Sequence, residues 1–316
     1  MIAVKTENLR HTYPAGRKTG PVEVLKGIDL EVETGCVFGF LGPNGSGKTT
    51  LFKILSTLLP LSNGDVSILG TDLKSEQYKV RKKIGVVFQS PSLDRKLTVR
   101  ENLKHHGHLY GIRGGELQSR IEEMLVKFNL VEKGNVLAEN LSGGQKRRVE
   151  IAKGLMHRPE LLIMDEPSTG LDLGARRSLW NVITSLKDEG VTILLTTHLM
   201  MEAELCDRLA IIDQGRVVST GSPDEMKKTI GGDIITIQTP DPDKFIEIYH
   251  EKFGDTPLLV NGRVRIEKER GHEFVPQIVE SFPGMVTGVS YGKPTLEDVF
   301  ISATGRAFVS ETEEAE

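Results

Sequence analysis

The chain has few cysteines, no long hydrophobic run and no excess of basic charge. Its two cysteines, Cys36 and Cys206, stand far apart without metal-ligand spacing, which favours two small buried residues in a reducing compartment over a disulfide. No run of about 18 apolar residues occurs, so we expect no segment that spans a bilayer. Residues 1–5 lack the basic and apolar stretches of a secretory signal, so none is expected.

The balance of charge argues against nucleic acid as the main partner. The 316 residues include 40 Lys and Arg against 44 Asp and Glu, a formal net charge of −4. Proteins that bind nucleic acid neutralise its phosphates with an excess of basic residues, which this chain lacks. With 38% hydrophobic and 27% charged residues the composition is that of a globular protein, and the length suits about two domains.

The strongest motif is a glycine-rich turn between an apolar run, residues 36–41, and a helix-like run, residues 51–55. It consists of Gly42, Pro43, Asn44, Gly45, Ser46, Gly47, Lys48, Thr49 and Thr50. Strand, turn and helix form the context of the G-x-x-x-x-G-K-[ST] loop, whose backbone N–H groups surround phosphates, and this context disfavours a turn that binds nothing. We expect Lys48 to reach the β- and γ-phosphates of a nucleoside triphosphate, and Thr49 to ligate Mg²⁺.

Four polar residues end apolar runs that are typical of buried strands. Gln89 follows residues 84–88, Asp165 and Glu166 follow residues 161–164, and His198 follows the run that ends at residue 197. Helix-like segments separate these runs, which predicts a mainly parallel sheet covered on both faces. Ligands of such sheets bind at the carboxyl ends of the strands, where all four residues and the glycine-rich turn fall.

The remaining pattern predicts three further parts of an α/β fold. Residues 2–9, 22–25 and 28–32 indicate an N-terminal antiparallel β subdomain, and helical spacing indicates a helical insert at about 90–155. The pattern changes near residue 225. Residues 226–316 predict the βαββαβ order of a small ferredoxin-like α+β domain, with a hairpin at Asn261-Gly262 and an acidic tail over residues 311–316.

A second anion site is indicated by Leu141-Ser142-Gly143-Gly144-Gln145, which precedes a basic helix-like segment. Ser142 is predicted as an N-cap, and the two glycines expose backbone N–H groups at a helix start, but no lysine completes the site. Ser-Gly-Gly alone is a common loop. Its position about twenty residues before the apolar run that ends in Asp165 and Glu166 makes it a strong signal.

Together and in this order, these motifs resemble the ATP-binding cassette (ABC) ATPases over about residues 1–225. The resemblance rests on residues 42–49, Gln89, LSGGQ at 141–145, LLIMDEP at 161–167, residues 168–172 and His198. Residues 292–300, GKPTLEDVF, resemble the C-terminal segment of daunorubicin-type drug-exporter ATPases and their wider relatives. The resemblance implies a P-loop NTPase core that hydrolyses ATP to drive a separate integral membrane permease, export rather than import, and a location at the cytoplasmic face of the membrane.

The resemblance also implies a role for each site residue. Asp165 would hold Mg²⁺ through water, and Glu166 would act as general base or polarise the attacking water. Gln89 would sense both Mg²⁺ and this water. His198 would hydrogen-bond the γ-phosphate, and the flat face of Tyr13 would stack on adenine. The four residues Ser142, Gly143, Gly144 and Gln145 would cap the triphosphate of a second cassette, with Asp172 along the same interface, so that a homodimer encloses two ATP molecules.

Two other functions stay open at this point. Soluble ABC ATPases that act on ribosomes or nucleic acid usually have two cassettes or a coiled-coil insertion, and neither is visible here. A small-molecule kinase would leave LSGGQ and His198 without a purpose. We interpret His105, His106 and His108 as a solvated helical face rather than a metal cluster, and residues 146–148 as the exposed side of a helix.

Overall fold

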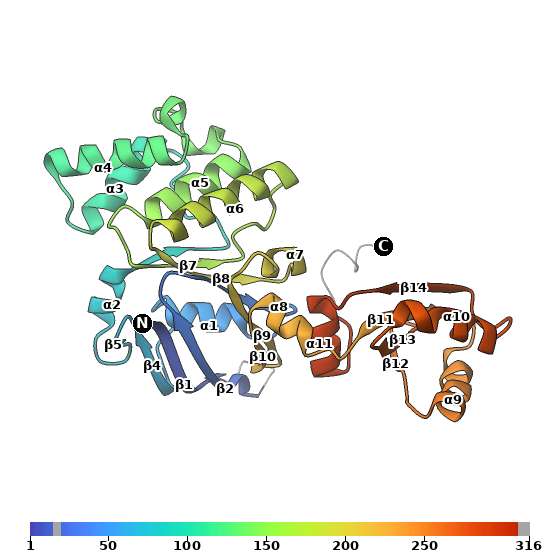
Figure 1. Cartoon of the computed structure of the whole chain (residues 1–316). Coiled ribbons are helices and arrows are strands. Elements are labelled where there is room, and N and C mark those ends of the chain that lie inside the picture. The colour runs from blue at the N-terminus through green and yellow to red at the C-terminus, as the bar shows by residue number, and fades with distance from the viewer. Residues whose placement is uncertain (15–19, 309–316) are drawn as a thin grey trace. The chain divides into compact units, whose positions relative to one another are not determined.

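The computed structural model describes residues 1–14 and 20–308, which form two compact units (Figure 1). The first unit comprises Met1–His198 and Cys206–Val217, and the second comprises Leu199–Leu205 and the chain from Val218 onward. The boundary predicted near residue 225 lies in α8 (Pro223–Lys228), within the second unit. The predicted acidic tail, residues 311–316, lies outside the described residues.

A six-stranded sheet forms the centre of the first unit, with strand order β10-β9-β3-β8-β7-β6. Its strands are β3 (Val37–Leu41), β6 (Ile84–Val87), β7 (Leu161–Asp165), β8 (Thr192–Thr197), β9 (Arg208–Asp213) and β10 (Arg216–Gly221). The neighbours from β6 to β9 are parallel, as the alternation of strands and helices predicts. Their carboxyl ends therefore meet at one edge of the sheet.

Alternate residues of the central strand β7 belong to two different cores. Leu161 and Ile163 pack with α1 (Lys48–Leu55) and the N-terminal sheet, whereas Leu162 and Met164 pack with helices α5 (Gly143–Gly154) and α6 (Leu173–Asp188). Successive side chains of a strand point to opposite faces, so helices must cover both sides of this sheet. Burial on both faces explains why the strand is an unbroken apolar run.

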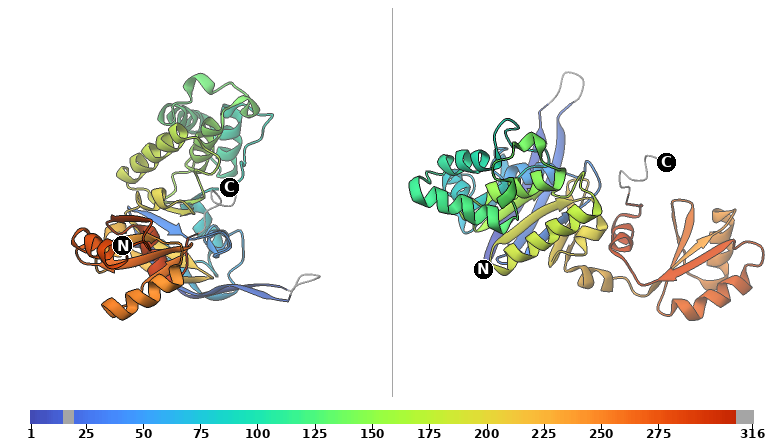
Figure 2. Two further views of the ribbon diagram at one scale, coloured as in Figure 1. Left: turned by 90° about the vertical axis from the view of Figure 1, so that its right-hand side faces the viewer. Right: turned by 90° about the horizontal axis from the view of Figure 1, so that it is seen from above.

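The second sheet of this unit is antiparallel, with strand order β2-β1-β4-β5. Its strands are β1 (Ile2–Tyr13), β2 (Val22–Glu33), β4 (Asn63–Ile68) and β5 (Thr71–Asp72). The sequence predicts three short strands over residues 2–9, 22–25 and 28–32, but β1 and β2 form one long ribbon (Figure 2). Register shifts along the pair let the apolar alternation change phase without ending either strand.

Helices follow β6 where the sequence predicts an insert. They are α3 (Val99–Leu109), α4 (Gly114–Lys127), the short 3₁₀ turns η1 (Val131–Lys133) and η2 (Ala138–Asn140), and α5, while α2 (Gln77–Lys83) precedes β6. Buried residues of α3, α4 and α5 share one core with β7 and β8. The insert therefore packs on the sheet, and this packing positions the residues that connect β6 to α3.

The second unit contains an antiparallel sheet with strand order β12-β13-β11-β14. The elements are β11 (Asp233–Gln238), α9 (Pro242–Phe253), β12 (Leu258–Val260), β13 (Arg263–Lys268), α10 (Gly271–Ser281), β14 (Gly288–Gly292) and α11 (Leu296–Thr304). Helices α7 (Met200–Ala203) and α8 contact α11. The βαββαβ order matches the sequence pattern, and a relation to ferredoxin-like domains stays a prediction.

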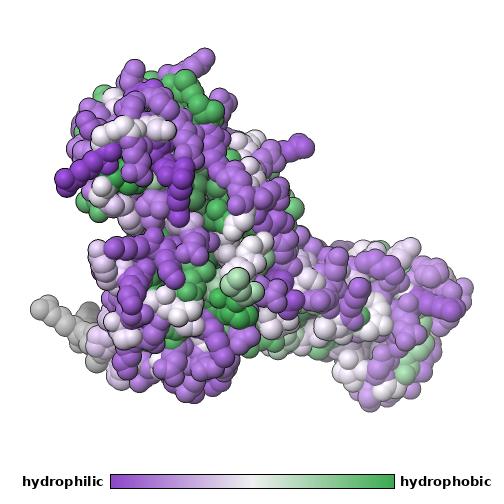
Figure 3. Space-filling model, turned by 60° about the vertical axis from the view of Figure 1, so that its left-hand side comes forward, coloured by the Kyte–Doolittle hydropathy of each residue, from purple (hydrophilic) through white to green (hydrophobic). Residues whose placement is uncertain are grey.

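Within the described ranges, no helix has both the length and the apolar character to cross a membrane. Hydrophilic residues cover most of the face drawn in Figure 3, and hydrophobic residues appear there in separate patches. Apolar side chains gather instead in the cores on the two faces of the central sheet and in the core of the second unit.

Candidate functional site

The loop between β3 and α1 has room only for glycine at two positions that shape it. Gly47, the N-cap of α1, has a φ of 109°, in a region that residues with a side chain rarely adopt. A Cβ on Gly42 would lie 2.2 Å from the carbonyl oxygen of Ile212. The loop is therefore held against β9 in a conformation that exposes its backbone N–H groups at the start of a helix.

Lys48 and Ser46 give this loop an affinity for anions. Lys48 is buried, and its Nζ donates to the carbonyl oxygens of Gly42 at 2.7 Å and Pro43 at 3.0 Å. Burial lowers the pKa of this ammonium, and the charges of Glu166 and Asp165 oppose the shift. The Ser46 hydroxyl is buried and has no hydrogen-bond partner among the described residues. A buried cation and an unpaired donor in one loop fit a bound phosphate.

Two neighbouring carboxylates at the end of β7 have different environments. Oδ1 of Asp165 accepts a hydrogen bond of 2.5 Å from Oγ1 of Thr196 on β8. Burial raises the pKa of Asp165, and the hydrogen bond from Thr196 counters part of this effect. Burial also acts against ionisation of Glu166, but the hydrogen bond and charge of His198 and the charge of Lys48 outweigh it and lower the pKa. The difference suits two separate roles for the pair.

Residues from three strand ends meet at Glu166. Its Oε2 lies 3.0 Å from Nε2 of Gln89, 3.1 Å from Oγ1 of Thr169 and 3.2 Å from Nδ1 of His198. Glu166 has a φ of 43°, a left-handed conformation that costs energy for a residue other than glycine. Its N–H donates to Oγ1 of Thr196 at 2.9 Å. The sequence predicted that these strand-end residues lie close together, and they do.

Tyr13, the predicted adenine contact, lies beside the glycine-rich loop. Its hydroxyl is 3.3 Å from Oγ1 of Thr50, and its ring packs edge-on against His11 with 4.8 Å between ring centroids. The side chain is half-buried, so part of the ring is accessible. Its role as an adenine contact stays a prediction.

The Ser-Gly-Gly turn forms a separate cavity of about 180 Å³. Ser142 caps α5: its Oγ accepts from the N–H of Gln145 at 3.3 Å, and Oε1 of Gln145 accepts from the N–H of Ser142 at 3.0 Å. Asp172, on the same cavity, caps α6 by accepting from the N–H of Ala175 at 2.8 Å. No residue of the glycine-rich loop lines this cavity, so one chain keeps its two predicted anion sites apart.

Arg147 is a buried residue of the site that the sequence pattern does not predict. Residues 146–148 were expected on the exposed side of a helix, but Arg147 is only 6% exposed. It donates to the carbonyl oxygens of Pro167 at 2.5 Å, Phe88 at 2.6 Å and Glu166 at 3.1 Å. Burial lowers its pKa, and the charge of Glu150 opposes the shift. The available signal was Glu150, three residues later, which pairs with Arg147 at 3.1 Å.

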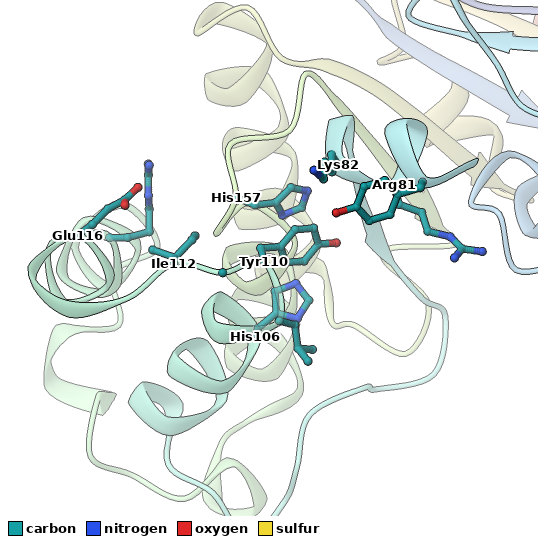
Figure 4. A pocket seen from close by; sticks show the side chains of 11 residues that line it. Arg81, Lys82, His106, Tyr110, Ile112, Glu116 and His157 are labelled. Carbon is teal, nitrogen blue, oxygen red and sulfur yellow. The ribbon is translucent and has the colours of Figure 1, made fainter. Parts of the chain in front are cut away.

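A larger cavity of about 830 Å³ is lined by residues of α2, α3 and α4 and by His157 (Figure 4). The rings of Tyr110 and His157 stack at 3.7 Å, and His106 lies next to Tyr110 at 5.2 Å. His105 and His108 are exposed as expected, but His106 is half-buried beside Tyr110, so the prediction of a solvated face is wrong for this residue. Burial lowers the pKa of His106 to about 4. The charges of Lys153 and His157 add to this shift.

Comparison with known proteins identifies the family. Residues 25–169 match the model of the ABC transporter family. The daunorubicin resistance ATP-binding protein DrrA3 of Streptomyces coeruleorubidus is 36% identical over 304 residues, which cover 92% of this chain and 94% of that protein. This chain belongs to the ATP-binding subunits of ABC transporters. The predicted family and the predicted activity, ATP hydrolysis, are thereby confirmed.

Further relatives and solved structures agree with this ABC assignment. The Nod factor export ATP-binding protein I of Burkholderia lata is 40% identical over 296 residues, covering 92% of this chain and 95% of that protein. A dimeric structure of the cassette MJ0796, bound to ADP and Pi, is 30% identical with a TM-score of 0.63, and covers 69% of this chain and 98% of that one. The structure of cbiO1 from Clostridium perfringens, part of the cbiONQ transporter complex, is 27% identical with a TM-score of 0.65. The match covers 80% of this chain and 96% of cbiO1. The predicted ABC ATPase core is confirmed.

Proposed function

We propose that this ABC ATPase powers export, and that two copies of the chain enclose two ATP molecules. The names of its relatives support export: DrrA3 and the linearmycin resistance protein LnrL of Bacillus subtilis, 40% identical over 233 residues and 73% of each chain, are resistance proteins. The Nod factor relative is an export protein. The single observation that carries the catalytic part of the proposal is the meeting of Gln89, Thr169 and His198 at the carboxylate of Glu166.

In the proposed site the glycine-rich loop and Lys48 bind the β- and γ-phosphates of ATP. Thr49, Asp165 through a water molecule, and Gln89 would hold Mg²⁺, which when bound would neutralise charge on the phosphates. A hydroxyl, one carboxylate and an amide oxygen suit Mg²⁺, which takes few protein ligands and keeps several waters. In keeping with such a sparse site, no group of three or more His, Cys, Asp or Glu side chains in residues 1–14 and 20–308 is arranged to bind a metal.

Glu166 acts on the water that attacks the γ-phosphate. Because its pKa is lowered, the carboxylate is ionised at neutral pH and accepts a proton or orients the water. Gln89 and His198 hold this carboxylate from two sides, and His198 also reaches toward the γ-phosphate. Tyr13 stacks on the adenine.

A second chain completes each site in this proposal. Ser142, Gly143, Gly144 and Gln145 offer helix-start N–H groups, Arg147 and Arg148 line the same cavity, and this cavity is separate from the phosphate loop of the same chain. A twofold symmetric dimer, with Asp172 along its interface, places each Ser-Gly-Gly turn on the ATP of the partner. The dimeric MJ0796 structure supports this arrangement.

We infer that the other partner is an integral membrane permease, which attaches the chain to the cytoplasmic face of the membrane. The relatives named for export and the membership of cbiO1 in a transporter complex support this inference. The helical insert, in particular residues 90–101 after Gln89, is our candidate for the segment that passes the motion to the permease. Purification from membranes tests this: a co-purifying membrane protein supports the permease, and ribosomes would support the alternative of a soluble ABC ATPase.

The variant Glu166→Gln tests the catalytic proposal. It keeps the shape of the side chain but removes the charge that accepts a proton, so we expect ATP hydrolysis to fall by about 10²-fold or more. ATP binding should persist, and a dimer should accumulate in ATP and Mg²⁺ during size-exclusion chromatography. Glu189→Gln, at an exposed position, is the control. A normal rate of phosphate release by Glu166→Gln would refute the role of Glu166.

A further inference from the structure

One face of α5 holds the segment that carries Gln89. Arg147 donates to the carbonyl oxygen of Phe88 at 2.6 Å, and Oε1 of Glu150 accepts from the N–H of Ser92 at 2.5 Å. Nζ of Lys153 donates to the carbonyl oxygen of Ser92 at 2.7 Å. The three helix residues are spaced three apart and so share one face of the helix. This face fixes the chain on both sides of Gln89.

The same guanidinium also holds the turn that carries Glu166. Nε of Arg147 donates to the carbonyl oxygen of Pro167, and Nη2 donates to that of Glu166. The N–H of Glu166 is held from the opposite direction by Thr196, so both ends of this left-handed residue are fixed. All three nitrogens of Arg147 are used, in the planar fork that only arginine offers, and a lysine could not make these contacts together.

We propose that Arg147 is a positioning residue that holds Glu166 and Gln89 and links both to the Ser-Gly-Gly turn. Gly143, Gly144 and Gln145 of the turn and Arg147 belong to one helix, α5, which Ser142 caps. Contact of the turn with the ATP of the partner chain therefore sets the position of Arg147, and through it the carboxylate that acts on the chain's own ATP. This inference rests on the catalytic role proposed for Glu166.

The full chain with Arg147→Lys tests the inference. We expect kcat to fall by about 10-fold to 100-fold, because small misplacements of a catalytic group have effects of this size, while KM for ATP changes by less than about twofold. The control is Arg120→Lys, since Arg120 is also 6% exposed and pairs with Glu123 three residues later, at 3.0 Å. Arg120 contacts neither Glu166 nor Gln89 in the described chain, so its variant should lose thermal stability alone.

A second variant and a double mutant distinguish the possible failures. Glu150→Gln keeps an acceptor for Ser92 but removes the counter-charge of Arg147, and we expect a smaller loss of kcat. In a Glu166→Gln background, Arg147→Lys should lower the residual rate by a smaller factor than in the wild type, because the part of its effect that passes through Glu166 is already lost and only the part through Gln89 remains. A multiplied loss in that background would overturn the inference, as would a wild-type kcat for both Arg147→Lys and Glu150→Gln. Normal hydrolysis by Glu166→Gln alone would instead refute the proposed function.

Discussion

A single hydroxyl joins the two carboxylate residues at the end of β7. Oγ1 of Thr196 donates to Asp165 at 2.5 Å and accepts from the N–H of Glu166 at 2.9 Å, and Thr196 is 1% exposed. A hydroxyl has one proton to donate, so the bond to Asp165 leaves its lone pairs free for Glu166. Thr196 thus fixes both the orientation of Asp165 and the strained backbone of Glu166.

The variant Thr196→Val replaces this hydroxyl by a methyl group and leaves two buried partners unpaired. We expect the free energy of unfolding to fall by about 1–3 kcal/mol, and kcat to fall with it because both carboxylates lose a restraint. Thr192→Val is the matched control: Thr192 is also 1% exposed on β8, but its Oγ1 accepts from Gly35, away from the site. Denaturant unfolding and ATPase assays measure both, and equal losses of kcat would contradict the role of Thr196.

At the residue scale, the sequence predicts those site residues that interrupt an apolar pattern. Gln89, Glu166 and His198 each end a buried run, so their meeting follows from parallel strands and needs no knowledge of side-chain contacts. Arg147 follows no such rule. It is buried because carbonyl groups from two distant segments and Glu150 surround it, and only the folded chain brings these together. Charge alone predicts an exposed position for such a residue.

At the scale of elements, α5 and α8 both begin with a capping box headed by serine, but in different surroundings. Ser142 and Gln145 cap α5 beside the candidate partner site, and Ser222 and Glu225 cap α8 in the second unit. In each box, the serine Oγ accepts from the backbone N–H three residues later, and the side-chain oxygen of that later residue accepts from the serine N–H. Comparing variants of Ser142 and Ser222 therefore separates the effect of a cap on stability from any effect on ATP hydrolysis.

We expect Ser142→Ala and Ser222→Ala each to lower the free energy of unfolding by about 1 kcal/mol, the usual value of an N-cap. Only Ser142→Ala should also slow ATP hydrolysis, since its hydroxyl and the helix start it orders face the proposed ATP of a second chain. Thermal unfolding and steady-state ATPase rates of both variants measure this. If Ser142→Ala hydrolysed ATP as fast as Ser222→Ala, the turn would have no part in the reaction.

The elements that the sequence places best are those buried on both faces. Strand β7 lies between two cores, so every residue is apolar up to Asp165 and its limits are clear. The limits of β1 and β2 are harder to predict from the sequence, because register shifts along this pair break the alternation of apolar and polar residues that marks a strand. Strand β9 continues the parallel sheet beside β3, but the sequence pattern does not predict it.

At the scale of the whole molecule, the two half-sites that we propose for each chain do not meet. The phosphate loop with Lys48 lies at the carboxyl edge of the sheet, and the cavity at Ser142–Gln145 is lined by α5, α6 and residues 170–172 alone. A homodimer that pairs these halves has two composite sites, each built from both chains. A chain with a defect in one half-site and a chain with a defect in the other should therefore each be inactive alone, but should recover ATP hydrolysis when the two chains are mixed.

Chains with Lys48→Ala and chains with Gly143→Asp make this test. The first should not hold the triphosphate, and the second places a negative charge where the partner's phosphate is proposed to lie. A Cβ on Gly143 comes no nearer than 3.9 Å to Leu171, so the backbone at this position leaves room for a side chain to begin. Each variant alone should be inactive at both sites. In an equal mixture that exchanges chains, half of the dimers combine one site with both defects and one site with none, so about one quarter of the wild-type rate should return.

Fluorescence transfer between labelled chains verifies exchange while phosphate release is measured. An inactive mixture with proven exchange would show that each chain completes its own site or that both sites must act together, and either result excludes the independent composite sites on which this expectation depends.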